Sequence, residues 1–281
     1  GGVDIASLLA RKSLFFQRNV SLLRHRLLRT NQVHVEQSEL DQRRTMDMER
    51  TNALARRLGT ASQTAAPHQV ALIDNGGKRP THLVFHPHAP LLLVADETLS
   101  LSLWHYGDQM TGCSNRFRNR NAPNTRITAL EIVHESDPHL GLVLVGSDDG
   151  VVRGWRGFGE RGNETLVSGW HAVPELHSQT SNRGIMVMQL LQPDVQLLVG
   201  GSQTPLLRLW DIGTERCVRI MPTGALKGAG VSCVTHLATA SAATLIAGCV
   251  DGSLQMHDSR AASSCPIASL KAGGGHVANV A

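Results

Sequence analysis

Three histidines lie within seven residues of one another, and imidazole is a common ligand of transition metals. His82, His86 and His88 stand at even offsets, so an extended strand would place all three side chains on one face. Pro87 interrupts the hydrogen bonding of such a strand, however, and no fourth ligand is indicated. We therefore interpret these residues as strand and turn histidines and predict no metal site.

The segment from Gly157 to Gly162 matches the G-x-G-x-x-G spacing of loops that bind dinucleotide phosphates. Such a loop also needs a helix that opens at the third glycine, because the helix N-terminus holds the pyrophosphate. Residues 163–167 (Asn-Glu-Thr-Leu-Val) have the composition of a strand instead. The segment is therefore predicted to be a surface loop, and no cofactor is expected.

Two adjacent acidic residues, Asp148 and Asp149, precede Gly150 and could suggest a calcium loop. The remaining oxygen ligands are absent at the required spacing, so we interpret the three residues as a hairpin turn. The motifs of serine hydrolases, zinc proteases and phosphate-binding loops are also absent from the sequence. Two carboxylates distant in sequence could still meet in space, but nothing marks such a pair. The sequence thus predicts no catalytic residues and no enzymatic activity.

The cysteines are widely spaced and odd in number. The five are Cys113, Cys217, Cys233, Cys249 and Cys265. None forms a C-x-x-C pair, so a zinc site of that kind is excluded. Reduced thiols in a cytoplasmic protein are the expected state. No apolar run approaches the roughly 18–20 residues of a membrane span, so none is predicted.

The elements that must position these residues form an internal repeat. Four segments share a short apolar strand, a small residue, a turn, a second strand and an anchor residue. The anchor lies nine positions after the small residue, and successive anchors are 51, 55 and 47 residues apart. The small residues are Ala95, Gly146, Gly201 and Gly248, and the anchors are Trp104, Trp155, Trp210 and His257. We expect these anchors to pack within the repeats, and the smaller, polar imidazole to weaken the last one.

The turns and flanking strands recur as well. Asp-Gly pairs, which favour hairpin turns, occur at Asp149-Gly150 and Asp251-Gly252, and an aspartate follows the anchor at Asp211 and Asp258. Each unit also has an earlier strand and a strand after the anchor. The expected earlier strands are 82–86, 127–133, 185–191 and 231–237, and residues 216–221 exemplify the later one. Four strands per unit, repeated radially, predict an all-β chain of propeller blades.

This pattern resembles the WD40 repeat, although Trp210-Asp211 is the only literal Trp-Asp pair. A more specific set of segments resembles the C-terminal propeller of the raptor family, the scaffold subunits of TOR kinase complex one. In chain order they are Val84–Pro87, Arg126–Glu131, Asp148–Gly150, Arg208–Asp211, Met221–Gly224, Ser232–Thr235, Asp251–Leu254 and Asp258–Arg260. The resemblance covers about residues 80–260, and the segment before them matches only in kind.

The resemblance implies a ring of seven blades, of which this chain carries about four. We expect a basic helical segment at residues 1–60 and a linker at 61–80, in which Val70–Ile73 is a strand that could close the ring. The predicted blades occupy 81–120, 121–170, 183–224 and 229–271 within a propeller region at 81–281, and a fifth starts at 276. A four-blade arc exposes two apolar faces, so we expect poor solubility, self-association or an incomplete gene model.

Charge separates the predicted helical segment from the blades. The net charge of +4 divides into +5 for residues 1–60 (11 basic minus 6 acidic) and −1 for residues 61–281 (16 minus 17). A near-neutral body argues against nucleic-acid binding. For the first helix, three interpretations remain open: packing on the rest of the protein, binding a partner, or binding a membrane surface as an anchor or targeting peptide.

The raptor resemblance implies a non-catalytic scaffold in nutrient and growth signalling. Its partners would be subunits of the TOR kinase complex, and it would be cytoplasmic, reaching endomembranes through the parent complex. The alternative is an unrelated WD40 adaptor, such as a ubiquitin-ligase substrate receptor, which an upstream F-box-like segment would favour. A third hypothesis, an enzyme on a propeller scaffold, needs a polar cluster at the ring centre that no motif supports.

Overall fold

Two compact units make up the chain in the computed structural model: residues 1–74 with 87–89, and residues 75–86 with 90–281. The structure describes residues 72–86, 89–107, 110–133, 141–176, 184–191, 196–225, 229–237, 244–261, 265–271 and 275–278. The predicted helical segment at residues 1–60 lies outside the described residues, as does most of the predicted linker. Residues 72–79, at the end of that linker, are not in a strand.

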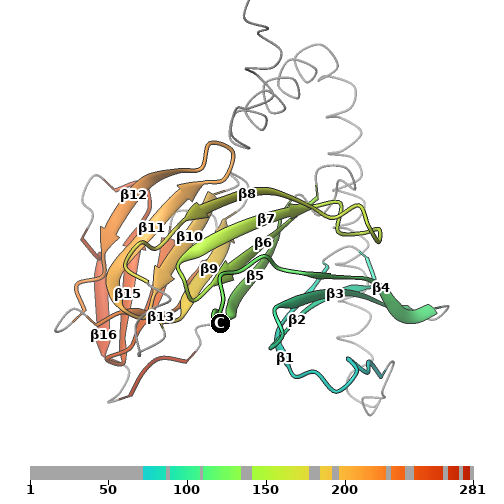
Figure 1. Cartoon of the computed structure of the whole chain (residues 1–281). Coiled ribbons are helices and arrows are strands. Elements are labelled where there is room, and N and C mark those ends of the chain that lie inside the picture. Colours follow the sequence, from blue (N-terminus) through green and yellow to red (C-terminus); the bar gives the residue numbers. More distant parts are fainter. Residues whose placement is uncertain are drawn as a thin grey trace, which may run out of the picture. The chain divides into compact units, whose positions relative to one another are not determined.

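All regular secondary structure among the described residues is β-strand, in four antiparallel sheets of four strands each (Figure 1). We call these sheets blades 1 to 4. Blade 1 holds β1 (Pro80–Phe85), β2 (Leu91–Asp96), β3 (Ser100–Gly107) and β4 (Met110–Arg118). Blade 2 holds β5 (Ile127–Val133), β6 (Leu142–Ser147), β7 (Val151–Arg156) and β8 (Thr165–His171). Blade 3 holds β9 (Met186–Leu191), β10 (Gln196–Gly201), β11 (Thr204–Asp211) and β12 (Arg216–Pro222). Blade 4 holds β13 (Val231–His236), β14 (Thr244–Cys249), β15 (Ser253–Asp258) and β16 (Ala268–Lys271). In every blade the strands pair in chain order, as a meander.

The second strand of each middle blade is an apolar run. β6 has the sequence LVLVGS and is buried throughout, and β10 has the sequence QLLVGG and is buried after its first residue. Such runs form where both faces of a strand are covered by neighbouring layers. The outer strand β12 instead alternates between exposed and half-buried residues over most of its length, as expected for a strand covered on one side only.

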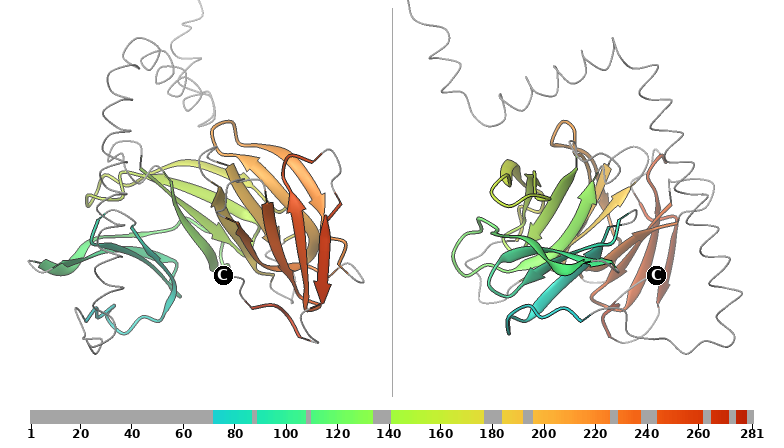
Figure 2. Two further views of the ribbon diagram at one scale, coloured as in Figure 1. Left: turned by 180° about the vertical axis from the view of Figure 1, so that it is seen from behind. Right: turned by 90° about the vertical axis from the view of Figure 1, so that its right-hand side faces the viewer.

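Apolar side chains between neighbouring blades form three cores. Figure 2 shows the backbone of the four blades in two further views. The core between blades 1 and 2 includes Leu93, Leu101, Val143 and Trp155. The core between blades 2 and 3 includes Leu144, Met186 and Leu197, and the core between blades 3 and 4 includes Leu198, Leu207 and Leu245. The first strands of successive blades, β1, β5, β9 and β13, are neighbours along this series. Each blade therefore buries its apolar faces only through its neighbours.

A small residue in the second strand makes room for the first residue of the following blade. A Cβ atom on Gly146 would lie 2.5 Å from Cε of Met186, and one on Gly200 would lie 2.8 Å from Cγ1 of Val231. Val277 takes the same place in blade 4, because a Cβ on Gly248 would lie 2.8 Å from its Cβ. The Val277 N–H also donates to the Cys249 carbonyl at 3.2 Å.

Strand register corrects one position of the predicted repeat. Counting nine positions back from each anchor makes Gly201 the counterpart of Gly146. In the structure, however, Trp155 pairs with Val143 in blade 2, and Trp210 pairs with Leu197 in blade 3. The residue three positions after Leu197 is Gly200, which is therefore the equivalent of Gly146. The hairpin of blade 3 is one residue longer than that of blade 2, so counting back from the anchor selects the wrong glycine.

Candidate functional site

The four predicted anchors occupy equivalent positions on the third strands. Each anchor pairs with the second residue of the second strand in its blade. The pairs are Leu92 with Trp104, Val143 with Trp155, Leu197 with Trp210, and Leu245 with His257. Trp104 is 8% exposed, Trp155 3% and His257 1%, whereas Trp210 is half-buried. Three of the four anchor rings are therefore almost completely buried within the blades.

The polar atoms of these anchors differ from blade to blade. The indole N–H of Trp155 donates to Oδ1 of Asn119 at 2.7 Å. The indole nitrogens of Trp104 and Trp210, and both ring nitrogens of His257, are buried without a hydrogen-bond partner among the described residues. Burial lowers the pKa of His257, and the positive charge of Arg219 lowers it further.

The acidic and glycine residues that the repeat singled out lie in turns. Oδ1 of Asp149 accepts the Val151 N–H at 3.1 Å, and Oδ1 of Asp251 accepts the Ser253 N–H at 3.0 Å. The glycines that follow, Gly150 and Gly252, have φ angles of +75° and +82°, which L side chains rarely adopt.

The two aspartates that follow an anchor also accept backbone N–H groups. Oδ1 of Asp211 accepts the Thr214 N–H at 3.1 Å, and Oδ1 of Asp258 accepts the Arg260 N–H at 2.8 Å. Asp149 further pairs with Arg153 at 3.1 Å. Each of the four carboxylates thus holds a local turn in a different hairpin, and the four do not form one cluster.

The histidine and glycine motifs lie apart from one another. His82 is in β1, and burial lowers its pKa. A hydrogen bond with the Thr128 backbone acts in the opposite direction but is the smaller effect. His86 follows that strand, and His88 lies outside the described residues. No group of three metal-type ligands occurs in the described part of the chain. Strand β8 begins at Thr165, where a dinucleotide loop would need a helix.

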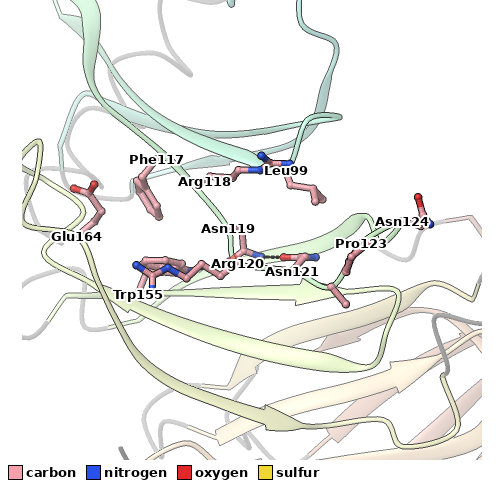
Figure 3. Close-up of a pocket in the computed structure, with 11 residues that line it drawn as sticks. Leu99, Phe117, Arg118, Asn119, Arg120, Asn121, Pro123, Asn124, Trp155 and Glu164 are labelled. Atoms are coloured by element: carbon pink, nitrogen blue, oxygen red, sulfur yellow. Dashed lines mark hydrogen bonds between the residues drawn. The ribbon is translucent and has the colours of Figure 1, made fainter.

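A pocket of about 640 Å³ lies between blades 1 and 2 (Figure 3). It is formed mainly by the segment that leaves β4 and crosses to β5. Its lining comprises Leu99, Phe117, Arg118, Asn119, Arg120, Asn121, Ala122, Pro123, Asn124, Trp155 and Glu164. Sequence reasoning did not find this pocket, because its residues come from two blades.

Hydrogen bonds fix the polar part of the pocket lining. The Asn119 N–H donates to the Leu99 carbonyl at 2.8 Å, and the Asn119 side chain joins the Trp155 indole to the Asn121 amide. Asn121 in turn donates to Oγ of Ser147 at 2.8 Å. The side-chain amides of the buried Asn119 and the half-buried Asn121 therefore have partners before any ligand is present.

The apolar floor of the pocket is an aromatic pair. Phe117 and Trp155 are 7% and 3% exposed, and their ring centroids lie 5.0 Å apart with an interplanar angle of 53°. Glu164 stands at the edge, where Oε2 accepts the Gly162 N–H at 2.8 Å. Its own backbone N–H and that of Gly162 hold the pKa of Glu164 below its ordinary value, so it is an anion at neutral pH.

Two arginines of the pocket lining have exposed side chains. For Arg118 and Arg120, no side-chain hydrogen bond or ion pair joins the guanidinium group to another described residue. Their neighbours Arg116 and Arg126 are engaged, with Ser102 at 2.8 Å and Asp148 at 3.3 Å respectively. In the sequence, the signal that could have pointed to this basic segment is the presence of four arginines and no acidic residue over residues 116–126.

Four meandering sheets packed face to face, with small second-strand residues that make room for the segment that follows, define a partial WD40-type β-propeller. No protein-family model matches the chain. No helix among the described residues is long and apolar enough to cross a membrane. The predicted fold class is thereby confirmed for the described residues.

The chain is similar to several curated raptor proteins. It is 32% identical over 191 residues to a protein raptor homolog of Dictyostelium discoideum, covering 66% of this chain and 12% of that protein. It is 31% identical over 179 residues to regulatory-associated protein of TOR 1 of Arabidopsis thaliana, covering 63% and 12%. The identity is 27% over 190 residues with target of rapamycin complex 1 subunit KOG1 of Saccharomyces cerevisiae, covering 66% and 11%.

A solved structure agrees with these relatives. The crystal structure of Chaetomium thermophilum Raptor matches with a TM-score of 0.63 and 28% identity, over 73% of this chain and 18% of that one. The chain thus spans about an eighth of the length of the curated relatives it matches. The predicted resemblance is confirmed: the blades form a raptor-like propeller segment.

Proposed function

We propose that the chain contributes a non-catalytic scaffold surface to a protein of TOR signalling. The observation that carries the proposal is the similarity, over about two thirds of the chain, to proteins named as raptor or as a subunit of target of rapamycin complex 1. Its partners are then subunits of the TOR kinase complex, and its location is cytoplasmic. Nucleic acid is not among its partners, because the predicted propeller region and linker together carry a net charge of only −1.

The non-catalytic part of the proposal is supported by the roles of the polar residues. Asp149, Asp211, Asp251 and Asp258 each accept a backbone N–H within a turn, so they serve the hairpins. An acid–base or nucleophilic mechanism needs such groups to converge on one cavity. The proposed mechanism is therefore surface presentation, in which loops and strand edges of the blades contact other proteins and no bond is made or broken.

Co-purification of the full-length parent protein with TOR kinase tests this function. We expect TOR kinase to be recovered with the tagged parent protein from lysates prepared in mild detergent. A WD40 protein unrelated to TOR signalling, tagged in the same way, is the control for adventitious capture. Failure to recover TOR kinase, under conditions in which the control retains its own partners, would reject the proposal.

A further inference from the structure

A glycine turn precedes the first strand of blade 1. It contains Asn75-Gly76, the one position in the sequence at which an asparagine is followed by a glycine. Gly76 and Gly77 are both exposed and have φ angles of +67° and +72°, and positive φ at both central residues is the geometry of a type I′ turn. A Cβ atom on Gly76 would meet nothing within 4 Å, so the backbone that follows Asn75 is uncrowded.

The side chain of Asn75 is held between this turn and strand β4. Its Nδ2 donates to the Lys78 carbonyl at 3.3 Å, and its Oδ1 accepts an N–H of the Arg116 guanidinium. Nε of Arg116 donates to Oγ of Ser102 at 2.8 Å, which orients the guanidinium group. A cation bonded to an amide oxygen stabilises negative charge that develops on that oxygen. The carbonyl carbon Cγ of Asn75 is therefore placed for attack by a nucleophile.

An asparagine before a glycine carries such a nucleophile in its own backbone. The Gly76 nitrogen adds to Cγ of Asn75, a five-membered succinimide ring closes, and the side-chain nitrogen leaves as ammonia with the proton that the backbone nitrogen loses. Water then opens the ring at either carbonyl and gives aspartate or isoaspartate. The sum is asparagine and water converted to aspartate and ammonia, without an oxidant or a reductant. Glycine favours ring closure because it has no Cβ to crowd the nitrogen.

We propose that Asn75 is a site of spontaneous deamidation in the folded protein, and that Arg116 pairs with the carboxylate that forms there. The new anion replaces an amide oxygen that already accepts from this guanidinium, and hydrogen bonds between two charged groups are stronger than those with one neutral partner. Because ammonia is lost, the change is one-way. It goes beyond the proposed scaffold function, since it alters the chain itself.

Other cations favour the same product. Lys78 and Arg79 follow the turn directly. Arg116 and Arg118 are both exposed and lie opposite Ser102 and Ser100 of β3, on one face of β4. A carboxylate at position 75 therefore meets positive charge on the turn and on the strand, and the modification lowers the net charge of this basic surface by one.

Peptide mapping by mass spectrometry tests the reaction in the purified chain, incubated at pH 7.5 and sampled over time. We expect the peptide that contains Asn75 to accumulate both aspartate and isoaspartate, the latter detected with an isoaspartate methyltransferase. Asn124 and Asn163 are controls in the same digest, because both are exposed but precede threonine and glutamate. They should convert more slowly, since a side chain crowds the nitrogen that follows them. A sample digested at the start corrects for conversion during digestion.

Thermal unfolding of substituted chains tests the ion pair. Asn75→Asp introduces the product's charge directly and should raise the unfolding midpoint by about 1–3 °C, as expected for a partly exposed pair. The same substitution in a chain that carries Arg116→Gln should give no rise, and added salt should reduce the rise in the unsubstituted background. Asn163→Asp is the matched control. Because Nδ2 of Asn163 donates to Oε2 of Glu160 at 2.6 Å, a carboxylate there should lower the midpoint.

Three outcomes would overturn the proposal. If the folded chain stays unconverted at Asn75 over a period in which the urea-unfolded chain converts, the fold blocks ring closure. If the product is aspartate alone, the cyclic route is excluded. If Asn75→Asp leaves the midpoint unchanged, or raises it equally beside Arg116→Gln, the pair with Arg116 does not form. None of these measurements involves TOR kinase, so the modification and the scaffold function are tested separately.

Discussion

His257 stands where the other three blades carry tryptophan. The tryptophan blades share a register irregularity beside the anchor, between Leu103 and Trp104, between Gly154 and Trp155, and between Leu209 and Trp210. In blade 4 the pairing of β15 with β16 ends at Met256, one residue before His257. The smaller imidazole thus coincides with a shorter outer strand. Because its ring nitrogens have no partner among the described residues, burial favours the neutral ring.

The buried imidazole predicts a pH-dependent stability. The folded chain holds His257 neutral, whereas the unfolded chain takes up a proton as the pH falls below the ordinary pKa of 6.5. The free energy of unfolding should therefore decrease from pH 7.5 to pH 5.5. His257→Phe should flatten this slope, as measured by urea unfolding at both pH values. Part of the slope should persist, because burial also lowers the pKa of His82.

Replacement of an exposed histidine, His171→Phe on β8, controls for the loss of a histidine as such and should retain the original slope. A slope that is the same in His257→Phe as in the unsubstituted chain would show that the ring is not held neutral in the folded state.

At the scale of elements, the blades are joined by close contacts and by hydrogen bonds from outer strands. Asn115 in β4 donates to the Phe158 carbonyl of blade 2 at 3.0 Å, and Arg219 in β12 donates to the carbonyls of Ser259 and Ala261 in blade 4. These two residues occupy equivalent positions, because each is paired with the residue before its anchor tryptophan. In blade 4 the same position, opposite Met256, is held by Ala268. The methyl side chain of Ala268 cannot donate such a hydrogen bond.

The small residue under each following blade gives a graded prediction. Gly200→Ala should lower the free energy of unfolding by about 1–3 kcal/mol, because the new Cβ would lie 2.8–2.9 Å from the stiff, β-branched Val231. Gly146→Ala should cost less, about 1 kcal/mol, because the nearest atom is the flexible terminal methyl of Met186. Chemical denaturation measures both.

Gly169→Ala is the matched control on β8, since its Cβ would meet nothing closer than 3.8 Å. It should leave stability unchanged or raise it by about 0.5 kcal/mol, through the reduced entropy of the unfolded chain. Equal losses for Gly200→Ala and Gly169→Ala would contradict the packing role assigned to the second-strand glycine.

At the scale of the whole molecule, apolar side chains are exposed on blade 4. All four residues of β16 are exposed, with Leu270 at 64%, and Ile267 just before the strand is 57% exposed. An exposed strand with apolar side chains favours pairing with a second chain. This surface gives the expected self-association of the chain a definite location.

Leu270→Lys should shift the purified chain toward the monomer, because it replaces exposed apolar surface with a charge on this strand. Light scattering coupled to size-exclusion chromatography measures the change. Ala268→Lys adds the same charge to β16 without removing a large apolar side chain, and should have the smaller effect. If the unsubstituted 281-residue chain is already a monodisperse, cooperatively unfolding monomer, the expectation of self-association is wrong.

The sequence alone determined the blades, because their signals are local. Apolar runs such as Leu142–Val145, the turns at Asp149-Gly150 and Asp251-Gly252, and the regular spacing of the anchors each depend on residues that are neighbours along the chain. The observed strands β5 and β12 begin at the expected residues, Ile127 and Arg216. The resemblance to raptor was also readable, since it depends on ordered segments and not on their contacts.

Only the tertiary structure decided the contacts between blades. It replaced Gly201 with Gly200 as the small residue of blade 3, because hairpin length shifts the register and a count from the anchor cannot detect this. It also brought Asn119 of the crossing segment against Trp155 of the next blade. The physical reason is the same in both cases: these positions acquire their environment only when two sheets stack, and sheet stacking joins residues that are distant in sequence.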